Sequence, residues 1–371
     1  MTVFFIVIFF IYFLFVVLLI AGLNRLFLSQ QPNSSIIPQS ITIIVPFRNE
    51  EKQLPCLIAS LKNINYPKEK FEVILVDDHS QDNSCEVVNK LIAGLTNFKL
   101  IKVAAAGKKN AITEAIDNAS GEIIITTDAD CEVPNVWLTS INARFQNPTT
   151  EMVVGAVRIN QTDSFFSKLQ AIEFSSLIGS AAATLTLGFP GMCSGANLSY
   201  RKAAFAEVDG FNGNAHIASG DDEFLMRKVV EKFGANSLLF LNDSNAVVAT
   251  CPQPSIKEFF MQRLRWAGKW RYNSSLSVKL LAVFIFVFQF SFLLLVVAFF
   301  FSMLNSLLIA LLIVKILLEG IFLYKTSKFL KQNISIFAFL LLQVIYPLYT
   351  ITVGLLSNVM DVSWKGRTIK R

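Results

Sequence analysis

The sequence has few of the side chains that hold soft metals or build disulfide frameworks. Its 371 residues include only two histidines and five cysteines, and the cysteines form no Cys-x-x-Cys pair. Two histidines exclude a histidine-based metal cluster, and an odd, scattered set of cysteines argues against a zinc site and a disulfide framework. The same cysteine usage favours a reducing compartment. The five are Cys56, Cys85, Cys131, Cys193 and Cys251.

Charged residues are scarce as well. They make up 16% of the chain, whereas 53% of the residues are hydrophobic and 34 are phenylalanine. Long apolar stretches near both ends account for these values, and the sequence between them, from about Asn33 to Ser275, is long enough for one sizeable water-soluble domain. The net charge of +6 comes largely from Lys and Arg beside the apolar stretches. This placement indicates positive-inside topology signals or contact with anionic lipid or substrate phosphate, and it argues against nucleic-acid binding.

The apolar stretches predict membrane helices. Val3–Leu23 carries no charge and lacks both a basic leader and a small-residue cleavage site, which predicts an uncleaved anchor. Leu280–Val314 is uncharged over more than one span, so we expect two helices that turn near Asn305-Ser306, the second ending at about Leu323. A basic loop of Lys325, Lys328 and Lys331 and a last span, Ile334–Leu356, follow.

The topology of the C-terminus stays open. Three C-terminal spans after a cytoplasmic domain place Arg371 outside, whereas the positive-inside rule favours a basic tail inside. The predicted segments are an anchor (1–28), an α/β domain (38–254), an amphipathic interface helix (255–275), a membrane region of about three helices (276–358) and a basic tail (359–371).

Short β-branched runs alternate with helical segments between the membrane stretches, which predicts an α/β domain with a mostly parallel sheet. Gln30–Ser40 reads as a linker, and Ser164–Leu187 as a helix rich in small residues. The predicted strands are Ile41–Val45, Phe71–Val76, Phe98–Val103, Glu122–Thr126 and Glu151–Ile159. The predicted helices between them are Glu51–Leu61, Ser84–Leu95, Lys108–Asn118 and Val136–Arg144.

Acidic residues follow two of these strands at the point where each ends. Asp77-Asp78 and Asp128-Ala129-Asp130 both come directly after an apolar run. An open α/β sheet binds its ligand at the carboxyl ends of its strands, so we expect a ligand site there. Asp221-Asp222 and the basic-aromatic run Gln262-Arg263-Leu264-Arg265-Trp266 continue the series.

Taken in order, these motifs together with Ile41–Glu50 resemble those of family 2 glycosyltransferases. The resemblance is nearest to membrane-embedded members such as cellulose, chitin and hyaluronan synthases and ceramide glucosyltransferases. It covers Ile41 to Trp266, and the ordered set is far more specific than any one motif. It implies a GT-A fold, membrane helices on either side, a UDP-sugar donor and a divalent cation, Mg²⁺ or Mn²⁺.

The resemblance also implies a donor site. Pro46, Asn49 and Glu50 would border the uridine, although the same residues are also typical of a strand end and a helix start. Asp78 would accept hydrogen bonds from the uracil or ribose. Lys108 would reach the diphosphate, the alternative being a solvated lysine.

Metal and diphosphate contacts fall on the Asp-x-Asp element. By the resemblance, Asp130 is a metal ligand, Asp128 binds metal or sugar hydroxyls, and Arg265 pairs with the diphosphate. Carboxylate oxygens together with substrate phosphates are the ligands that Mg²⁺ prefers. A divalent ion would neutralise the charge of the leaving diphosphate.

The resemblance also implies the residues of the acceptor site. Asp222 is the candidate general base, because inversion needs a carboxylate that removes the acceptor's hydroxyl proton. Asp221 stands where the family usually has Glu, which leaves its supporting role open; acidic residues at a helix N-terminus are the structural alternative. Gly195, Gln262 and Trp266 would line the acceptor site, although tryptophan is also common at membrane interfaces without a catalytic role.

These expectations combine into a membrane-bound inverting glycosyltransferase that moves a sugar from a UDP-sugar to a lipid or a growing glycan. We expect it in a bacterial inner membrane with its catalytic domain in the cytoplasm. Glycolipid synthesis and processive polymer synthesis both fit the motifs. A catalytically inactive scaffold that binds nucleotide-sugar is the alternative. The sequence predicts neither the donor sugar nor the oligomeric state.

Overall fold

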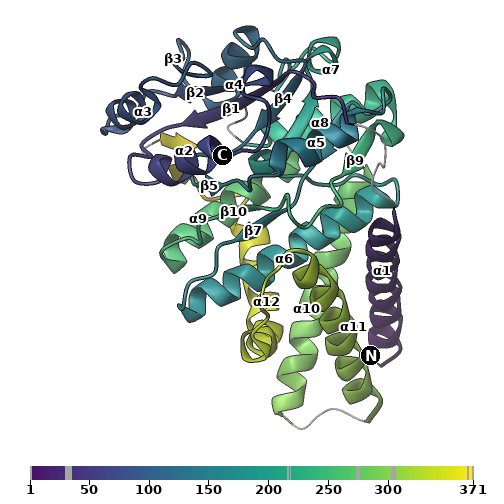
Figure 1. Cartoon of the computed structure of the whole chain (residues 1–371). Coiled ribbons are helices and arrows are strands. Elements are labelled where there is room, and N and C mark those ends of the chain that lie inside the picture. The colour runs from purple at the N-terminus through teal and green to yellow at the C-terminus, as the bar shows by residue number, and fades with distance from the viewer. Residues whose placement is uncertain are drawn as a thin grey trace. The chain divides into compact units, whose positions relative to one another are not determined.

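The chain forms two compact units in the computed structural model (Figure 1). The structure describes residues 2–29, 36–214, 217, 219–272, 276–301, 306–365 and 367–369. Residues 25–160 and 184–251 make up what we call the α/β unit. Residues 1–24, 161–183 and 252–371 make up the membrane unit. Part of the predicted linker, residues 30–35, lies outside the described residues.

A seven-stranded sheet organises the α/β unit. Its order is β3-β2-β1-β4-β8-β6-β9. The first four strands are mutually parallel, β8 runs antiparallel to β4 and β6, and β9 is parallel to β6, which confirms a mostly parallel sheet. All seven residues of β1 are buried, as in a strand covered on both faces. The strands are β3 (Phe98–Lys102), β2 (Phe71–Asp77), β1 (Ile41–Phe47), β4 (Ile123–Thr126), β8 (Leu198–Arg201), β6 (Met152–Val154) and β9 (Leu238–Phe240).

Helices and a smaller sheet complete this unit. The smaller sheet has the order β5-β10-β7. Its strands are β5 (Cys131–Glu132), β10 (Val248–Thr250) and β7 (Val157–Ile159). The helices are α2 (Leu54–Lys62), α3 (Ser84–Ile92), α4 (Lys108–Asp117), α5 (Trp137–Phe145), α7 (Lys202–Glu207) and α8 (Asp221–Phe233), with short 3-10 turns at Lys68–Lys70, Gly195–Asn197 and Ala235–Ser237.

Three predictions about this unit are wrong in detail. The single strand expected over Glu151–Ile159 is two strands, β6 and β7, which belong to different sheets. The chain changes sheet at Gly155, where a Cβ atom would lie 2.2 Å from the Asn197 side chain. Pro46 lies inside β1 and not after it, which is tolerated because β4 pairs only with residues 41–44. The helix expected from Glu51 begins at Leu54.

The membrane unit is helical. Four of its helices are long and apolar enough to cross a membrane, over Val3–Leu28, Val278–Ala298, Ser306–Phe329 and Ile336–Leu356. This agrees with the predicted number of spans, although Asn305, at the expected turn, lies outside the described residues. The helices are α1 (Thr2–Leu28), α6 (Phe165–Thr186), α9 (Ile256–Ala267), α10 (Leu276–Phe300), α11 (Ser306–Phe329) and α12 (Ile336–Leu356), with a 3-10 turn at Gly268–Tyr272.

Helix α11 runs farther than predicted. Lys325 and Lys328 lie within it and not in a basic loop, since α11 ends only at Phe329. Long lysine side chains near a helix end can keep the ammonium in water while the stem stays on apolar surface. Lys331 follows the helix with a left-handed backbone, φ 53°.

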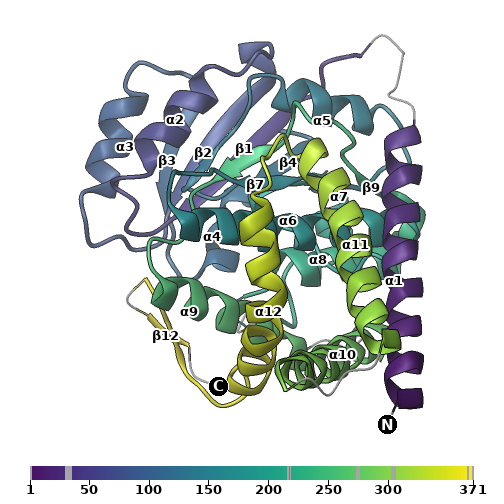
Figure 2. The same ribbon diagram turned by 90° about the horizontal axis from the view of Figure 1, so that it is seen from below.

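Small residues let the helices of the membrane unit approach closely. A Cβ at Gly179 of α6 would lie 2.4 Å from Thr326 of α11, and one at Gly22 of α1 would lie 2.7 Å from the Ala183 carbonyl oxygen of α6. Helices α1 and α11 run side by side in both views (Figures 1 and 2), and Tyr12 of α1 donates a hydrogen bond to Glu319 of α11. The anchor helix is therefore packed into this unit.

The end of the chain folds back on α9. Strands β11 (Val362–Trp364) and β12 (Arg367–Ile369) form an antiparallel hairpin. Val362 packs with Leu264 of α9 and Val353 of α12. The sequence predicted only a basic tail here, and its last residues, Lys370 and Arg371, lie outside the described residues.

Candidate functional site

The Asp-x-Asp element forms the turn that joins β4 to β5. The Thr127 amide still donates to the Ile44 carbonyl, so the turn starts at the carboxyl end of the parallel strands. Asp128 and Asp130 are both half-buried and are separated by the buried Ala129. Two carboxylates are thus held at the sheet edge where α/β folds bind ligands.

Lys108 joins this turn to the acidic end of α8. Its Nζ lies 2.8 Å from Asp128 Oδ1 and 3.2 Å from Asp221 Oδ2. Gly107 and Lys108 open α4, whereas Asp221 is the first residue of α8. The structure therefore brings together three predicted site residues from three separate elements, and it gives Asp221 a definite partner.

Asp222 lies beside Asp221 and contacts the loop at Gly195. Its Oδ2 accepts a hydrogen bond from the Gly195 amide at 3.1 Å, and its Oδ1 accepts one from the Glu223 amide at 2.8 Å. The Gly195 carbonyl accepts a hydrogen bond from Thr126 Oγ1 at 2.8 Å. The loop, the end of β4 and the start of α8 are thus tied together at the candidate base.

Side chains leave no spare room at Gly195. A Cβ there would lie 3.2 Å from Asp221 Oδ2 and 3.4 Å from Lys108 Nζ. Any larger residue would press on the ends of both side chains. The small residue predicted for the acceptor loop is therefore also what lets Lys108 and Asp221 pair.

The electrostatics of the cluster follow from its excess of carboxylates. Burial alone would lower the pKa of the Lys108 ammonium, but the neighbouring Asp128 and Asp221 carboxylates outweigh burial and raise it, so Lys108 is charged. Burial and the negative charge of Asp128 raise the pKa of Asp130 to about 6. Burial and the charge of Asp221 also raise the pKa of Tyr200, whose hydroxyl is buried without a hydrogen-bond partner among the described residues.

The same cluster fits a divalent cation. Asp128 and Asp130 offer carboxylate oxygens, and a positive ion beside Asp130 would favour its charged form. Within the part of the chain that the structure describes, no three or more His, Cys, Asp or Glu side chains are arranged so that they could hold a metal ion by themselves. The protein would thus supply only part of a coordination sphere, as is typical of Mg²⁺ sites that are completed by substrate phosphate.

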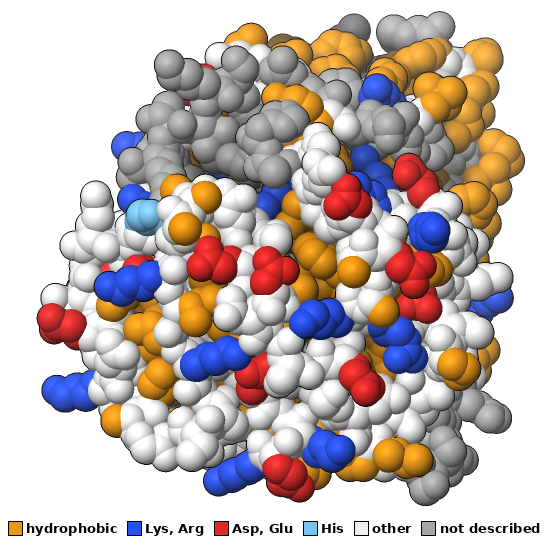
Figure 3. Space-filling view, turned by 90° about the horizontal axis from the view of Figure 1, so that it is seen from above, with side chains coloured by type: hydrophobic (Ala, Val, Ile, Leu, Met, Phe, Trp, Pro, Cys, Tyr) orange, Lys and Arg blue, Asp and Glu red, His pale blue; other side chains and the backbone are white. Residues whose placement is uncertain are grey.

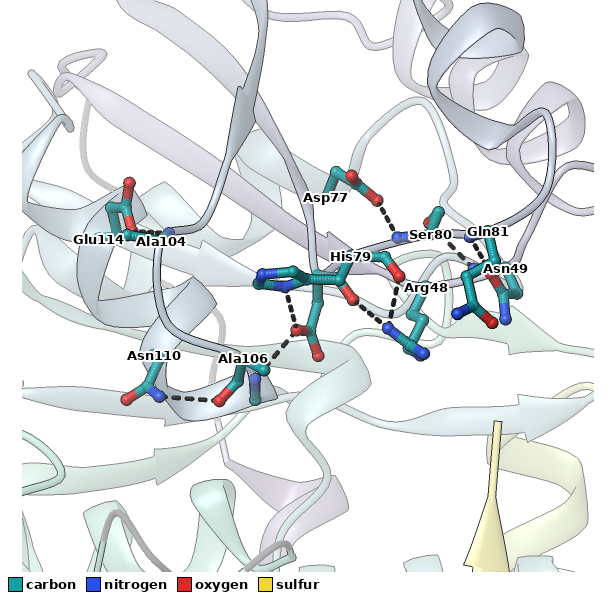
Figure 4. A network of polar contacts seen from close by, with 12 residues as sticks. Arg48, Asn49, Asp77, His79, Ser80, Gln81, Ala104, Ala106, Asn110 and Glu114 are labelled. Atoms are coloured by element: carbon teal, nitrogen blue, oxygen red, sulfur yellow. Dashed lines mark hydrogen bonds and ion pairs between the residues drawn. The ribbon is translucent and has the colours of Figure 1, made fainter. Parts of the chain in front are cut away.

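Asp78 lies in the turn after β2, where Figure 4 labels its neighbours Asp77 and His79. It is buried, and its Oδ1 accepts a hydrogen bond from the Gly107 amide at 2.9 Å, one residue before Lys108. His79 Nδ1 lies 3.4 Å from the same oxygen, and His79 has a left-handed backbone, φ 60°. The amide at the start of α4 and the predicted nucleotide residue are therefore directly linked.

The sequence missed the residue that clamps this turn. Arg48 is buried and donates to the carbonyl oxygens of Asp78, at 2.9 Å, and His79 (Figure 4). A charged residue directly after a strand that is apolar except for Thr42 was the available signal.

Asn49 and Glu50 have partners in the same network. Asn49 has φ 53°, and its Oδ1 accepts from the Gln81 amide at 2.7 Å, while the Glu50 amide donates to Ser84 Oγ. Their contact with a nucleotide, like that of Pro46 inside β1, stays a prediction.

The remaining predicted residues lie on α9 in the membrane unit. Gln262, Arg265 and Trp266 all fall within Ile256–Ala267. The helix starts where predicted, because Ser255 Oγ accepts a hydrogen bond from the Glu258 amide and so caps it. Their roles towards donor and acceptor are part of the proposal below.

Lys and Arg are interspersed with Asp and Glu on the face seen in Figure 3. Among the residues coloured there, no continuous basic stripe of the kind that follows a nucleic-acid backbone is visible.

The fold agrees with what known proteins show. Residues 42–209 match the model of glycosyl transferase family 2. The chain carries a family 2 glycosyltransferase domain. A mannosyltransferase from Pyrobaculum calidifontis, solved in complex with GDP-Man and Mn²⁺, covers 96% of this chain and 96% of its own at a TM-score of 0.54 and 16% identity. That likeness shows the GT-A-like fold of the family 2 domain.

Curated relatives are synthases of a glycolipid and of a polysaccharide. A beta-monoglucosyldiacylglycerol synthase from Trichormus variabilis is 27% identical over 242 residues, which cover 62% of this chain and 49% of that protein. A poly-beta-1,6-N-acetyl-D-glucosamine synthase from Staphylococcus epidermidis is 28% identical over 188 residues, 50% of this chain and 44% of that protein. The chain thus spans about half the length of these relatives.

Proposed function

We propose that this family 2 domain acts as a membrane-bound inverting glycosyltransferase, which transfers a sugar from a UDP-sugar to a lipid or a growing glycan. The observation that carries the proposal is the cluster in which Lys108 joins Asp128 to Asp221, with Asp222 beside it on the Gly195 amide. It places a cation and surplus carboxylates at one sheet edge. A nucleoside diphosphate with its divalent cation has the complementary charges.

The donor binds along β2, α4 and the Asp-x-Asp turn in this proposal. Asp78 accepts hydrogen bonds from the nucleoside, and Pro46, Asn49 and Glu50 border it. Lys108 and Arg265 pair with the diphosphate. Asp128 and Asp130 would hold Mg²⁺ or Mn²⁺, whose charge would offset that of the leaving diphosphate.

The transfer step needs one base. Asp222 accepts the proton of the acceptor hydroxyl while that oxygen bonds to the anomeric carbon, and the carbon–oxygen bond to the diphosphate breaks with its electron pair. The hydrogen bonds from Gly195 and Glu223 hold the carboxylate in a fixed direction. Asp221 acts through Lys108, and Gly195, Gln262 and Trp266 contact the acceptor.

The relatives favour two classes of acceptor. One is named for a glucosyl lipid and the other for a polysaccharide, so single addition to diacylglycerol and processive addition to a glycan are both supported. We place the protein in a bacterial inner membrane with the α/β unit in the cytoplasm, where UDP-sugars are made. An inactive scaffold that binds nucleotide-sugar is the rival reading, and the presence of the whole acidic cluster speaks against it.

The test is product analysis with the purified full chain in detergent. UDP-glucose, UDP-N-acetylglucosamine, UDP-galactose and GDP-mannose are each offered with 1,2-dioleoylglycerol and with total membrane lipid, and products are identified by mass spectrometry. One added sugar on a lipid supports glycolipid synthesis, whereas a ladder of masses supports a polymerase. Nucleotide binding without any product in the whole panel would favour the scaffold.

A variant checks the base. Asp222→Asn keeps the size of the side chain but cannot take the proton, so nucleotide release should fall about 10³-fold. Glu231→Gln, exposed on the same helix, is the matched control. Unchanged turnover in Asp222→Asn would overturn the assignment.

A further inference from the structure

Arg263 lies between two predicted acceptor residues, and the motif Gln-x-x-Arg-Trp treats it as a spacer. In the structure it is among the most buried charged residues of the membrane unit, with its side chain 5% exposed. It forms a two-pronged ion pair with Glu173 of α6, Nε to Oε1 at 3.0 Å and Nη2 to Oε2 at 2.5 Å. Burial alone would lower the pKa of Arg263, but the Glu173 carboxylate outweighs it and raises the pKa. The pair is thus charged and fixed in direction.

Two aromatic rings hold the same guanidinium from the sides. Its central carbon lies 4.4 Å from the ring centre of Phe259 and 4.2 Å from that of Trp266. Contacts at this distance are favourable cation–π interactions. Arg263 therefore packs on the Trp266 ring, which Phe174 of α6 also approaches, with the two ring centroids 6.2 Å apart.

A third contact fixes the Gln262 amide. Arg263 Nη1 donates to Gln262 Oε1. A guanidinium has only donors, so the amide must turn its oxygen to Arg263 and its NH₂ group away. Among the residues that the structure describes, that NH₂ group has no acceptor.

We propose that Arg263, fixed by Glu173, is a positioning residue that selects the groups α9 presents to the acceptor. These are the NH₂ donor of Gln262 and the Trp266 ring, which Arg263 holds in place. The acceptor that fits them offers an oxygen that accepts a hydrogen bond, such as a hydroxyl or ester oxygen, beside a flat apolar face, as a sugar ring or glyceride does. This inference rests on the proposed function for the acceptor role, whereas the positioning itself does not depend on turnover.

The kinetic test separates acceptor from donor. Acceptor and donor KM are measured for the full chain with the pair selected by the product assay, beginning with UDP-glucose and 1,2-dioleoylglycerol. Arg263→Met and Glu173→Gln should raise the acceptor KM about tenfold and leave the donor KM within about twofold. Arg263→Lys keeps the charge but loses the two-pronged geometry, so it should restore only part of the effect. Lys257→Met, exposed on the same helix, is the control and should match the wild type.

A spectroscopic test keeps the inference falsifiable if variants lose activity. Arg263→Met should shift the tryptophan emission of the wild-type chain but not that of a Trp266→Phe chain, because Trp266 packs directly on the guanidinium. An equal shift in both backgrounds, or an equal rise in both KM values, would overturn the positioning role. If the wild type turns over nothing while the emission shift appears only when Trp266 is present, the proposed function fails and the positioning stands.

Discussion

The two units differ in how completely their charged side chains are paired with side chains of opposite charge. In the membrane unit, Arg263 pairs with Glu173 and Lys315 pairs with Glu319, one cation for one carboxylate. In the α/β unit, Lys108 faces both Asp128 and Asp221, and Asp130 and Asp222 add further negative charge to the same cluster.

Matched charges are suited to building a structure. Lys315 donates to Glu319 and Gln343, and Tyr12 and Gln343 donate to Glu319, so three helices share one closed network. Removing either Lys315 or Glu319 leaves the opposite charge buried without compensation. An excess of carboxylates, by contrast, repels itself until a positively charged ligand binds. The two regions should therefore respond to substitution in opposite ways, one in activity and the other in stability.

The largest effect on activity is expected in the acidic cluster around Lys108. Lys108→Met removes the cation that the proposal assigns to the diphosphate, and activity should fall about 10³-fold, in the range seen when one preorganised charged donor is lost. The side chain is a quarter exposed, so the thermal midpoint should change little. Nucleotide release and thermal unfolding of the detergent-solubilised chain measure the two outcomes. Lys90→Met, exposed on α3, is the control, and a large loss of stability without loss of activity would reverse the comparison.

The next effect belongs to the matched network. Glu319→Leu leaves Lys315 buried without its carboxylate, and the free energy of unfolding should fall by about 3 kcal/mol. Adding Lys315→Met removes the orphaned charge and should restore at least half of that loss, since apolar replacement of a whole buried pair is often neutral. Unfolding of the full chain in detergent micelles measures it. If the double variant is as unstable as Glu319→Leu alone, the loss of stability does not come from the unpaired charge of Lys315.

The sequence predicted the members of the acidic cluster but not how they are connected. An apolar run that ends in carboxylates placed Asp128 at the end of a strand, whereas Asp221 and Asp222 were singled out by the resemblance to the family. That Lys108 bridges Asp128 and Asp221 depends on the packing of α4 against α8, which periodicity does not encode.

Other features were hidden for different physical reasons. Arg263 sits in a variable position of its motif, and its partner Glu173 lies 90 residues earlier in a helix of small residues. The strands β6 and β7 are separated in sequence only by Gly155 and Ala156, although they join different sheets. Apolarity reports burial, but it does not say against which sheet a strand is buried.

Glu72 lies in the α/β unit, but its carboxylate is fully matched by partners. Its substitution should therefore change stability, as in the membrane unit, and not activity. Glu72 accepts hydrogen bonds from the Ser120 amide and hydroxyl and from Thr42, and it pairs with Lys99. Burial would raise the pKa of this carboxyl, but these partners outweigh it and lower the pKa to about 2. Because the folded-state pKa lies below the unfolded one, the stabilisation is complete above about pH 5 and disappears as the pH falls towards 2.

Glu72→Gln should therefore lower the free energy of unfolding by about 2 kcal/mol at pH 7, and by progressively less between pH 5 and pH 2. Chemical unfolding of the full chain at a series of pH values measures the difference. Glu69→Gln, exposed in the turn before β2, is the matched control. A difference that stays constant down to pH 2 would mean that the charge of Glu72 is not what stabilises the fold.

The smallest predicted effect tests how strongly activity depends on the positions of Lys108 and Asp221 in the acidic cluster. Gly195→Ala places a methyl group 3.2 Å from Asp221 Oδ2 and 3.4 Å from Lys108 Nζ, so both side-chain ends must move by a few tenths of an ångström. Displacement on this scale should lower activity about tenfold, because catalysis depends steeply on position. The fold should tolerate the change, since the displaced groups are flexible ends. Gly191→Ala, whose nearest neighbour would lie 4.0 Å away, should keep full activity. Equal losses in the two alanine variants would place the sensitivity in the loop backbone and not in the Lys108–Asp221 pair.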